Sequence, residues 1–218
     1  MMDNNENWIV NIIKENCMFP FVIIDNWYSP NEEKSIWSEL DFYSTMPKEH
    51  IDRSEKTITA RYEDGSSKSK AFRWYLSKYY TDEGSKISSI LNTNYKTKTK
   101  KFLKIIEEIV PYGRMFLSAN NVNTMISYYE ENDFYDSHYD TSMWTQCTWF
   151  VKNPKLFEGG DFDFPESEYI VKLKHNRTVF FPCCYLHRVS PIKFYNQPKE
   201  IGYGRYTITH FYNKFVKI

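Results

Sequence analysis

The second half of the chain decides the fold, because short β-type runs follow one another there: TMISYY (124–129), CTWFV (147–151), FDF (162–164), YIVKL (169–173), TVFF (178–181) and YTITHFY (206–212). Turn-forming pairs separate these runs, among them Asn132-Asp133, Gly159-Gly160 and His175-Asn176. Closely spaced short strands are typical of a β-sandwich or jelly roll rather than of parallel α/β units. We therefore expect residues 121–218 to form a jelly-roll core.

The first 120 residues are predicted to supply one strand and the helices that support this core. The run FPFVIID (19–25) contains Val and Ile, which favour a strand. Ser29-Pro30-Asn31-Glu32 combines an N-cap, a proline at the first helical position and a capping-box glutamate, so a helix should begin there. Further helices are expected at 71–80 and 102–110. Helices followed by a β core indicate an α+β fold in a single domain spanning residues 1–218.

Composition favours a protein without a nucleic-acid or membrane partner. The formal net charge is zero and the pI is about 7.0, so no overall field attracts a polyanion. No apolar run reaches the length of a membrane span, and the first five residues are unlike a signal peptide. The cysteines lack zinc-type spacing, and Cys183 and Cys184 are adjacent, which indicates reduced thiols. We expect a cytoplasmic location.

The triplet His138-Tyr139-Asp140 is the strongest chemical signal in the sequence. Residues i and i+2 of a strand point to the same face, so His138 and Asp140 are able to grip one ion together. His187 follows after enough chain to return to the same place. Two imidazoles and one carboxylate on one side of a metal are the ligand set of non-haem Fe(II) oxygenases. Taken alone, an H-x-D triplet is weak, and a hydrogen-bonded surface pair is the alternative.

The surroundings of the triplet strengthen this interpretation. In order along the chain they are HYDTS (138–142), GGDF (159–162), VFFP (179–182), LHRVSP (186–191) and GRYTIT (204–209). Together they resemble the prolyl 4-hydroxylase-like family of 2-oxoglutarate/Fe(II) oxygenases, whose core is a double-stranded β-helix with N-terminal helices. The resemblance spans about 124–212, with a weaker echo in the strand at 19–25 and the helix after it.

The resemblance implies that His138, Asp140 and His187 are both the iron ligands and the catalytic centre. It implies that Arg205 pairs with the distal carboxylate of 2-oxoglutarate, a role that suits a planar and permanently charged guanidinium. It also places Tyr129 against that carboxylate.

Two details leave alternatives open at the cosubstrate end. Tyr128 is the alternative to Tyr129, because a one-residue slip in register exchanges which tyrosine points inward. The stretch between His187 and Arg205 is longer than the family usually has, so residues 193–202 are interpreted as an inserted loop. If that alignment is wrong, Lys193 or Lys199 would be the cosubstrate anchor instead.

The function expected from this resemblance is an Fe(II)- and 2-oxoglutarate-dependent dioxygenase. It would use O2 to hydroxylate an unactivated C–H bond and release succinate and CO2, with ascorbate as a further cofactor to consider. A prolyl residue in a peptide or protein is the first candidate substrate. The alternatives are the same chemistry on a free small molecule, or a non-catalytic metal-binding jelly-roll module.

The stretch from 44 to 70 is predicted to be a lid. It is polar and irregular, with turn signals at Pro47 and Asp64-Gly65, and it is long for a connection inside a compact domain. Long connections of this kind are usually functional or disordered. We expect it to be mobile at the mouth of the active site and to close over substrate.

Overall fold

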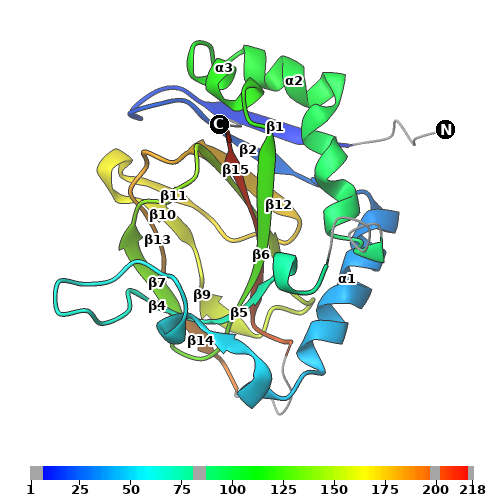
Figure 1. The fold of residues 1–218 in the computed structure, drawn as a ribbon, viewed down its shortest axis with the longest axis vertical. Helices are drawn as coiled ribbons and strands as arrows, with labels where there is room; N and C mark the ends of the chain where they lie inside the picture. Colours follow the sequence, from blue (N-terminus) through cyan, green and yellow to red (C-terminus); the bar gives the residue numbers. More distant parts are fainter. Residues whose placement is uncertain (1–6, 81–86, 197–201, 216–218) are drawn as a thin grey trace.

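Two antiparallel sheets face each other, and helices cover the outer face of the larger sheet (Figure 1). The computed structural model describes residues 7–80, 87–196 and 202–215. The helices there are α1 (Pro30–Ser44), α2 (Lys100–Glu107) and α3 (Tyr112–Leu117). The strands are β1 (Ile9–Ile13), β2 (Phe21–Asp25), β3 (Asp52–Arg53), β4 (Ser69–Lys70), β5 (Phe72–Tyr75), β6 (Asn121–Tyr129), β7 (Phe134–His138), β8 (Trp144–Phe150), β9 (Phe157–Gly159), β10 (Phe162–Phe164), β11 (Tyr169–Val171), β12 (Arg177–Pro182), β13 (His187–Val189), β14 (Ile192–Phe194) and β15 (Arg205–Asn213).

The larger sheet has the order β1-β2-β12-β8-β15-β6-β5-β3, and the smaller has the order β11-β10-β13-β7-β4. A separate pair, β9 and β14, lies at one end. Each of the six β-type runs of the second half contains a strand, and the run at 19–25 contains β2. The prediction of a jelly-roll core supported by N-terminal helices is therefore confirmed.

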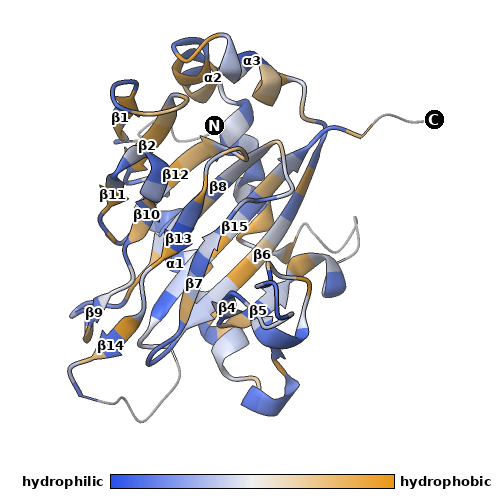
Figure 2. Ribbon diagram, turned by 90° about the vertical axis from the view of Figure 1, so that its left-hand side faces the viewer, coloured by the Kyte–Doolittle hydropathy of each residue, from blue (hydrophilic) through white to orange (hydrophobic). Residues whose placement is uncertain are grey.

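Alternating side chains divide the interior into two hydrophobic clusters. In β12, Val179 and Phe181 point between the sheets, whereas Phe180 points toward the helices. β2 alternates in the same way, with Phe21 facing the smaller sheet and Val22 the helices. Polar and apolar segments accordingly alternate along β6 and β15 (Figure 2). Because both faces of the larger sheet are covered, a polar residue on its inner face lies in the space between the sheets.

Two of the three predicted helices are present, and each begins at a clear N-cap residue. Helix α1 begins after Ser29 with a complete capping box to Glu32, and buries Ile36 and Leu40 against the larger sheet. The helix predicted at 102–110 is observed as α2, which spans Lys100–Glu107 after the N-cap Thr99, and α3, which was not predicted, follows it.

The helix predicted at 71–80 is wrong. Residues Phe72–Tyr75 form strand β5, which pairs with β6, and a 3-10 turn over Leu76–Lys78 follows. Phe72 and Trp74 face the helices while Arg73 faces the other way, so the repeat in this segment is two residues. A short apolar run is compatible with a helix or a strand, and here the pairing with β6 makes the segment a strand.

The predicted lid region, 44–70, is partly ordered along the edges of both sheets. Strand β3 extends the larger sheet and β4 extends the smaller one beside β7. Between them the chain forms a hairpin whose tip contains Gly65 at φ +83°. Within the described parts of the chain, no helix has the length and apolar character needed to cross a membrane.

Candidate active site

Two histidines meet where the strands of the smaller sheet pair. His138 ends β7 and His187 begins β13, and the antiparallel register sets them directly opposite each other. Their ring centres are 4.1 Å apart. Both side chains are buried between the two sheets.

Asp140 completes the cluster from the turn after β7. The sequence placed it in the same strand as His138, but the strand ends at His138 and the carboxylate reaches the site from the following turn. Its two oxygens lie 3.6 Å from His138 Nε2 and 3.6 Å from His187 Nε2. Among the described residues this is the one cluster of His, Cys, Asp or Glu ligand atoms close enough to share a metal, all within 4.8 Å of one another.

The orientation of each ligand is fixed by a second contact. His138 Nδ1 lies 2.8 Å from the carbonyl oxygen of Asp136, and His187 Nδ1 lies 3.0 Å from that of Tyr185. A carbonyl only accepts, so each Nδ1 carries the proton and each Nε2 presents a lone pair to the site. The Thr145 hydroxyl donates to Asp140 Oδ2 at 2.6 Å.

Burial and neighbouring charges shift the pKa values of two residues of this cluster, His187 and Asp140. Burial lowers the pKa of His187 to about 4, so its imidazole is neutral at neutral pH. Burial alone would raise the pKa of Asp140, but His187, His138 and the Thr145 hydroxyl hold it at about 2. A neutral imidazole at His187 and an ionised carboxylate at Asp140 are the forms in which these two side chains bind a metal.

Arg205 lies on the wall of the same cavity. It begins β15, is fully buried, and stands over the rings of Tyr129 (4.9 Å) and Trp149 (5.5 Å). None of its three guanidinium nitrogens has a hydrogen-bond partner among the described residues. Burial lowers its pKa, although Tyr129 favours the charged form without an ordinary hydrogen bond to it. A buried charge without a partner costs several kcal/mol, and an anion bound beside Arg205 would offset that cost.

The register also separates the two tyrosines. Tyr129 faces the cavity that His138 and Arg205 line, opposite Arg205 on β15. Tyr128 faces the helices, and its hydroxyl accepts from the amides of Gly202 and Gly204. Tyr129 is therefore the tyrosine within reach of the pocket.

The rival lysines are not brought to this cavity by the described structure. Lys193 lies in β14 with an exposed side chain, and it is absent from the cavity wall. Lys199 and half of the expected insertion at 193–202, residues 197–201, lie outside the described residues. Gly160, at φ +76°, allows Arg205 to pass: a Cβ there would lie 3.1 Å from Arg205 Cδ.

Sequence reasoning missed Thr207. It lies two residues after Arg205 on the same face of β15 and lines the same cavity. Its hydroxyl is buried and has no hydrogen-bond partner among the described residues. The period-two pattern after Arg205 could have revealed it, because GRYTIT places a hydroxyl on the same face.

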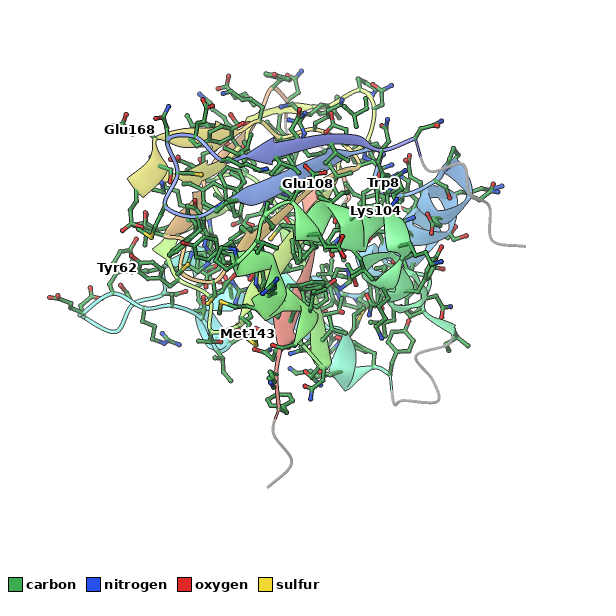
Figure 3. All side chains as sticks on the ribbon, turned by 90° about the horizontal axis from the view of Figure 1, so that it is seen from above. Trp8, Tyr62, Lys104, Glu108, Met143 and Glu168 are labelled. Carbon is green, nitrogen blue, oxygen red and sulfur yellow. The ribbon has the colours of Figure 1, made fainter. Side chains whose placement is uncertain are left out.

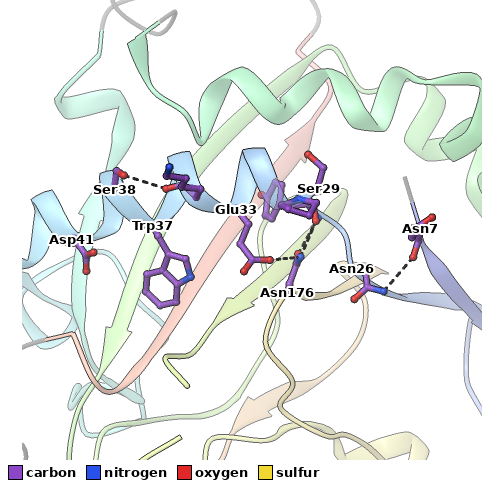
Figure 4. Close-up of a pocket in the computed structure, with 11 residues that line it drawn as sticks. Asn7, Asn26, Ser29, Glu33, Trp37, Ser38, Asp41 and Asn176 are labelled. Atoms are coloured by element: carbon purple, nitrogen blue, oxygen red, sulfur yellow. Dashed lines mark hydrogen bonds between the residues drawn. The ribbon is translucent and has the colours of Figure 1, made fainter. Parts of the chain in front are cut away.

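A more open pocket lies elsewhere, against α1 and Asn176 (Figure 4). Its polar groups largely bond to one another, as when Asn176 donates to Glu33 at 2.9 Å. His175 bonds Glu33 beside it, and His210 is buried against Thr124, so these two histidines have structural partners. Neither belongs to the metal cluster.

Comparisons with known proteins identify the fold. No protein-family model matches the sequence, and no curated protein matches it. Among solved structures, a Pseudomonas putida prolyl-4-hydroxylase superposes with a TM-score of 0.57 at 13% identity, covering 90% of this chain and 93% of that one. A Phytophthora capsici prolyl 4-hydroxylase gives 0.55 at 15% identity, covering 89% of this chain and 58% of that one. A 2OG-Fe(II) oxygenase-family oxidoreductase from Burkholderia pseudomallei gives 0.53 at 12% identity, covering 89% and 85%. The chain thus has the fold of 2-oxoglutarate/Fe(II) oxygenases, prolyl 4-hydroxylases among them.

Proposed function

We propose that this chain is an Fe(II)- and 2-oxoglutarate-dependent dioxygenase that hydroxylates a C–H bond in a peptide or protein, with a prolyl residue as the first candidate. One observation carries the proposal: a buried His–Asp–His cluster and a buried, unpartnered Arg205 line one cavity. The His–Asp–His cluster suits a metal cation, and Arg205 suits an anion. Fe(II) and 2-oxoglutarate together would supply the cation and the anion.

His138, Asp140 and His187 would hold the iron, and the donor set fits. Two neutral imidazole nitrogens and one carboxylate form the facial set of non-haem Fe(II) oxygenases, which leaves positions open for cosubstrate and O2. When bound, iron and 2-oxoglutarate together supply the activation of O2 and release succinate and CO2. Ascorbate remains a candidate reductant for the iron.

Arg205 would anchor the distal carboxylate of 2-oxoglutarate. Its bidentate guanidinium matches a carboxylate in shape and charge. The Thr207 hydroxyl, unpartnered on the same face, and the Tyr129 hydroxyl are placed to complete the contacts. Phe162 and Val189 line the same cavity and exclude water, which strengthens the charge pairing.

The substrate proposal depends on the fold neighbours that are named prolyl 4-hydroxylases. The runner-up is the same chemistry on a free small molecule. A non-catalytic metal-binding module is the less favoured reading, because a module that only binds metal has no use for a buried unpaired arginine.

A succinate-release assay tests the proposal. Protein loaded anaerobically with Fe(II) is mixed with 2-oxoglutarate, O2 and ascorbate, with and without proline-containing peptides. We expect slow succinate release without peptide, faster release with a true substrate, and a mass gain of one oxygen on the peptide. Peptide-stimulated release without any such gain would contradict hydroxylation, and stimulation only by free small molecules would favour the runner-up.

A further inference from the structure

The two metal-binding histidines are supported by different parts of the molecule. The His187 ring lies between Phe162 (5.2 Å, 19°) and Phe181 (4.9 Å, 66°), both buried in the core. The His138 ring instead stacks on Tyr135, with ring centres 3.5 Å apart and planes 8° from parallel. Tyr135 is only partly buried. His187 is therefore fixed by the core, whereas His138 is fixed by a residue at the rim.

The hydroxyl of Tyr135 is held by the hairpin, which we define as residues 57–70. The Thr59 hydroxyl donates to it at 3.1 Å and the Ala60 amide at 3.4 Å. The hairpin is closed by the bridge between Arg61 and Ser67 and joins the smaller sheet through β4 beside β7.

Arg73 also lies over the Tyr135 ring. The guanidinium carbon lies 5.1 Å from the ring centre. Its nitrogens donate to the Ile58 carbonyl at 3.4 Å and to the Ser69 hydroxyl at 3.0 Å, so Arg73 is also bonded to the hairpin. Tyr135 thus contacts both Arg73 and the candidate metal ligand His138, and the hairpin is hydrogen-bonded to both Tyr135 and Arg73.

The outer part of the hairpin, residues 61–66, is exposed to solvent. This outer part is polar, and Ile58 is 97% exposed. Beyond the Tyr135 contacts the hairpin docks on β7 through Tyr62 to Asp136 and Lys68 to the Ser137 carbonyl. Figure 3 shows Tyr62 at the periphery, on the opposite side of the molecule from Trp8. Elements with few buried apolar contacts open at low free-energy cost.

We propose that Tyr135 is a positioning residue that couples docking of the hairpin to the orientation of the His138 imidazole. A peptide braced against the docked hairpin would thereby tighten the metal site. The proposal rests on the proposed function, because it assumes that His138 binds Fe(II). Coupling is reciprocal: if hairpin docking strengthens metal binding, then metal binding stabilises the docked hairpin by the same factor.

Reciprocity gives a test that needs no substrate. Amide hydrogen exchange across the hairpin is measured in the full chain with and without Fe(II) under anaerobic conditions. In the wild type, Fe(II) should slow exchange at 58–60 several-fold. Tyr135→Phe keeps the stack on His138 but removes the hydroxyl that holds Thr59 and Ala60. It should lose this protection, and its Fe(II) affinity should fall by no more than the same several-fold factor.

Tyr62→Phe is the matched control. It also removes one phenol hydroxyl from the hairpin's contacts with β7, but it leaves the stack untouched. Fe(II)-dependent protection at 58–60 should persist in this variant. Equal protection in Tyr135→Phe and the wild type, or no Fe(II)-dependent protection in a wild type that binds Fe(II), would overturn the coupling.

Tyr135→Leu tests the positioning role directly, because it removes the ring that stacks on His138. Loss of a residue that orients a metal ligand typically weakens metal binding by about 10–100-fold. Fe(II) binding as tight as that of the wild type would overturn the positioning role while leaving the proposed function intact. A wild type that binds no Fe(II) at all would instead contradict the proposed function. The Tyr135→Phe comparison stays decisive if Tyr135→Leu folds poorly.

Discussion

Arg205 carries a positive charge into the space between the sheets without a bonded partner among the described residues. An arginine retained only for stability would be paired, because an unpaired buried charge destabilises the fold. Its presence is understandable if an anionic ligand completes the site. Arg205 was predictable from the sequence because its glycine-led motif is distinctive, whereas Thr207 was overlooked because a threonine in a strand is ordinary.

Replacing Arg205 by Met should separate stability from ligand binding. Without ligand, the variant should unfold at the same temperature as the wild type or higher, since a lone buried charge is removed. Its Kd for 2-oxoglutarate should rise roughly 30-fold or more, equivalent to about 2 kcal/mol or more. Thermal unfolding and calorimetric titration of metal-loaded protein measure both effects. Lys193→Ala is the control, and weaker binding in that variant alone would mean that the anchor is misassigned.

Thr145 should strengthen Fe(II) binding through its hydrogen bond to the candidate ligand Asp140. Thr145→Val keeps the side-chain volume but removes the 2.6 Å bond to Asp140 Oδ2, so Fe(II) affinity should fall by about tenfold or more. Thr148→Val is the matched control on the same strand: Thr148 bonds Thr178 on the face toward the helices. It should leave Fe(II) affinity unchanged in the same competition titration. If Thr145→Val binds Fe(II) no more weakly than Thr148→Val, the Thr145 hydrogen bond does not support metal binding.

At the scale of elements, the sequence predicted the strands that lie between clear turn signals and missed others. Six runs of the second half and the run at 19–25 contain strands. Strands β9, β13 and β14 have three residues each, too few to show a period, and the five-residue strands β1 and β7 were not predicted either. Phe72-Arg73-Trp74-Tyr75 suited both a helix and a strand, and only its place beside β6 settles the outcome. The motifs of the candidate site residues are chemical rather than periodic, and the structure brings these residues to one cavity, while their roles stay predictions.

The junction between β2 and β12 gives a prediction about pH. Asp25 on β2 accepts hydrogen bonds from Arg177 and Lys174, with the Lys174 contact at 2.7 Å. Burial alone would raise the pKa of Asp25, but the two cations outweigh it and hold the pKa below its ordinary value. A lowered pKa in the folded state adds stability above the unfolded value of about 4, and this is lost as the pH falls through the folded value.

Asp25→Asn should therefore lower the free energy of unfolding at pH 7 by about 1–3 kcal/mol, the typical cost of losing a charged hydrogen-bond partner. The difference between variant and wild type should shrink as the pH falls below about 4. Urea unfolding at several pH values measures this difference. A difference that stays constant from neutral to acid pH would contradict an ionic role for Asp25.

For the molecule as a whole, the order of the elements explains the site. The larger sheet carries Arg205 and Tyr129, while the end of β7, the turn after it and the start of β13 supply the His–Asp–His cluster on the same cavity. The proposed cation and anion sites therefore share one cavity, which is the arrangement that a chelated cosubstrate would need. Closure of 44–70 over substrate stays a prediction, as do a single domain and a cytoplasmic location. The structure adds that the hairpin within that stretch already contacts Tyr135.

The central claim is that His138, Asp140 and His187 form one Fe(II) site, and anaerobic metal titration tests it most directly. The wild type should bind one Fe(II) per chain, and 2-oxoglutarate should then produce the visible charge-transfer absorption of an iron–keto acid chelate. His138→Ala and His187→Ala each remove one of only three protein ligands, so both should lose the bound iron and the absorption. Unchanged stoichiometry in both variants would contradict the account.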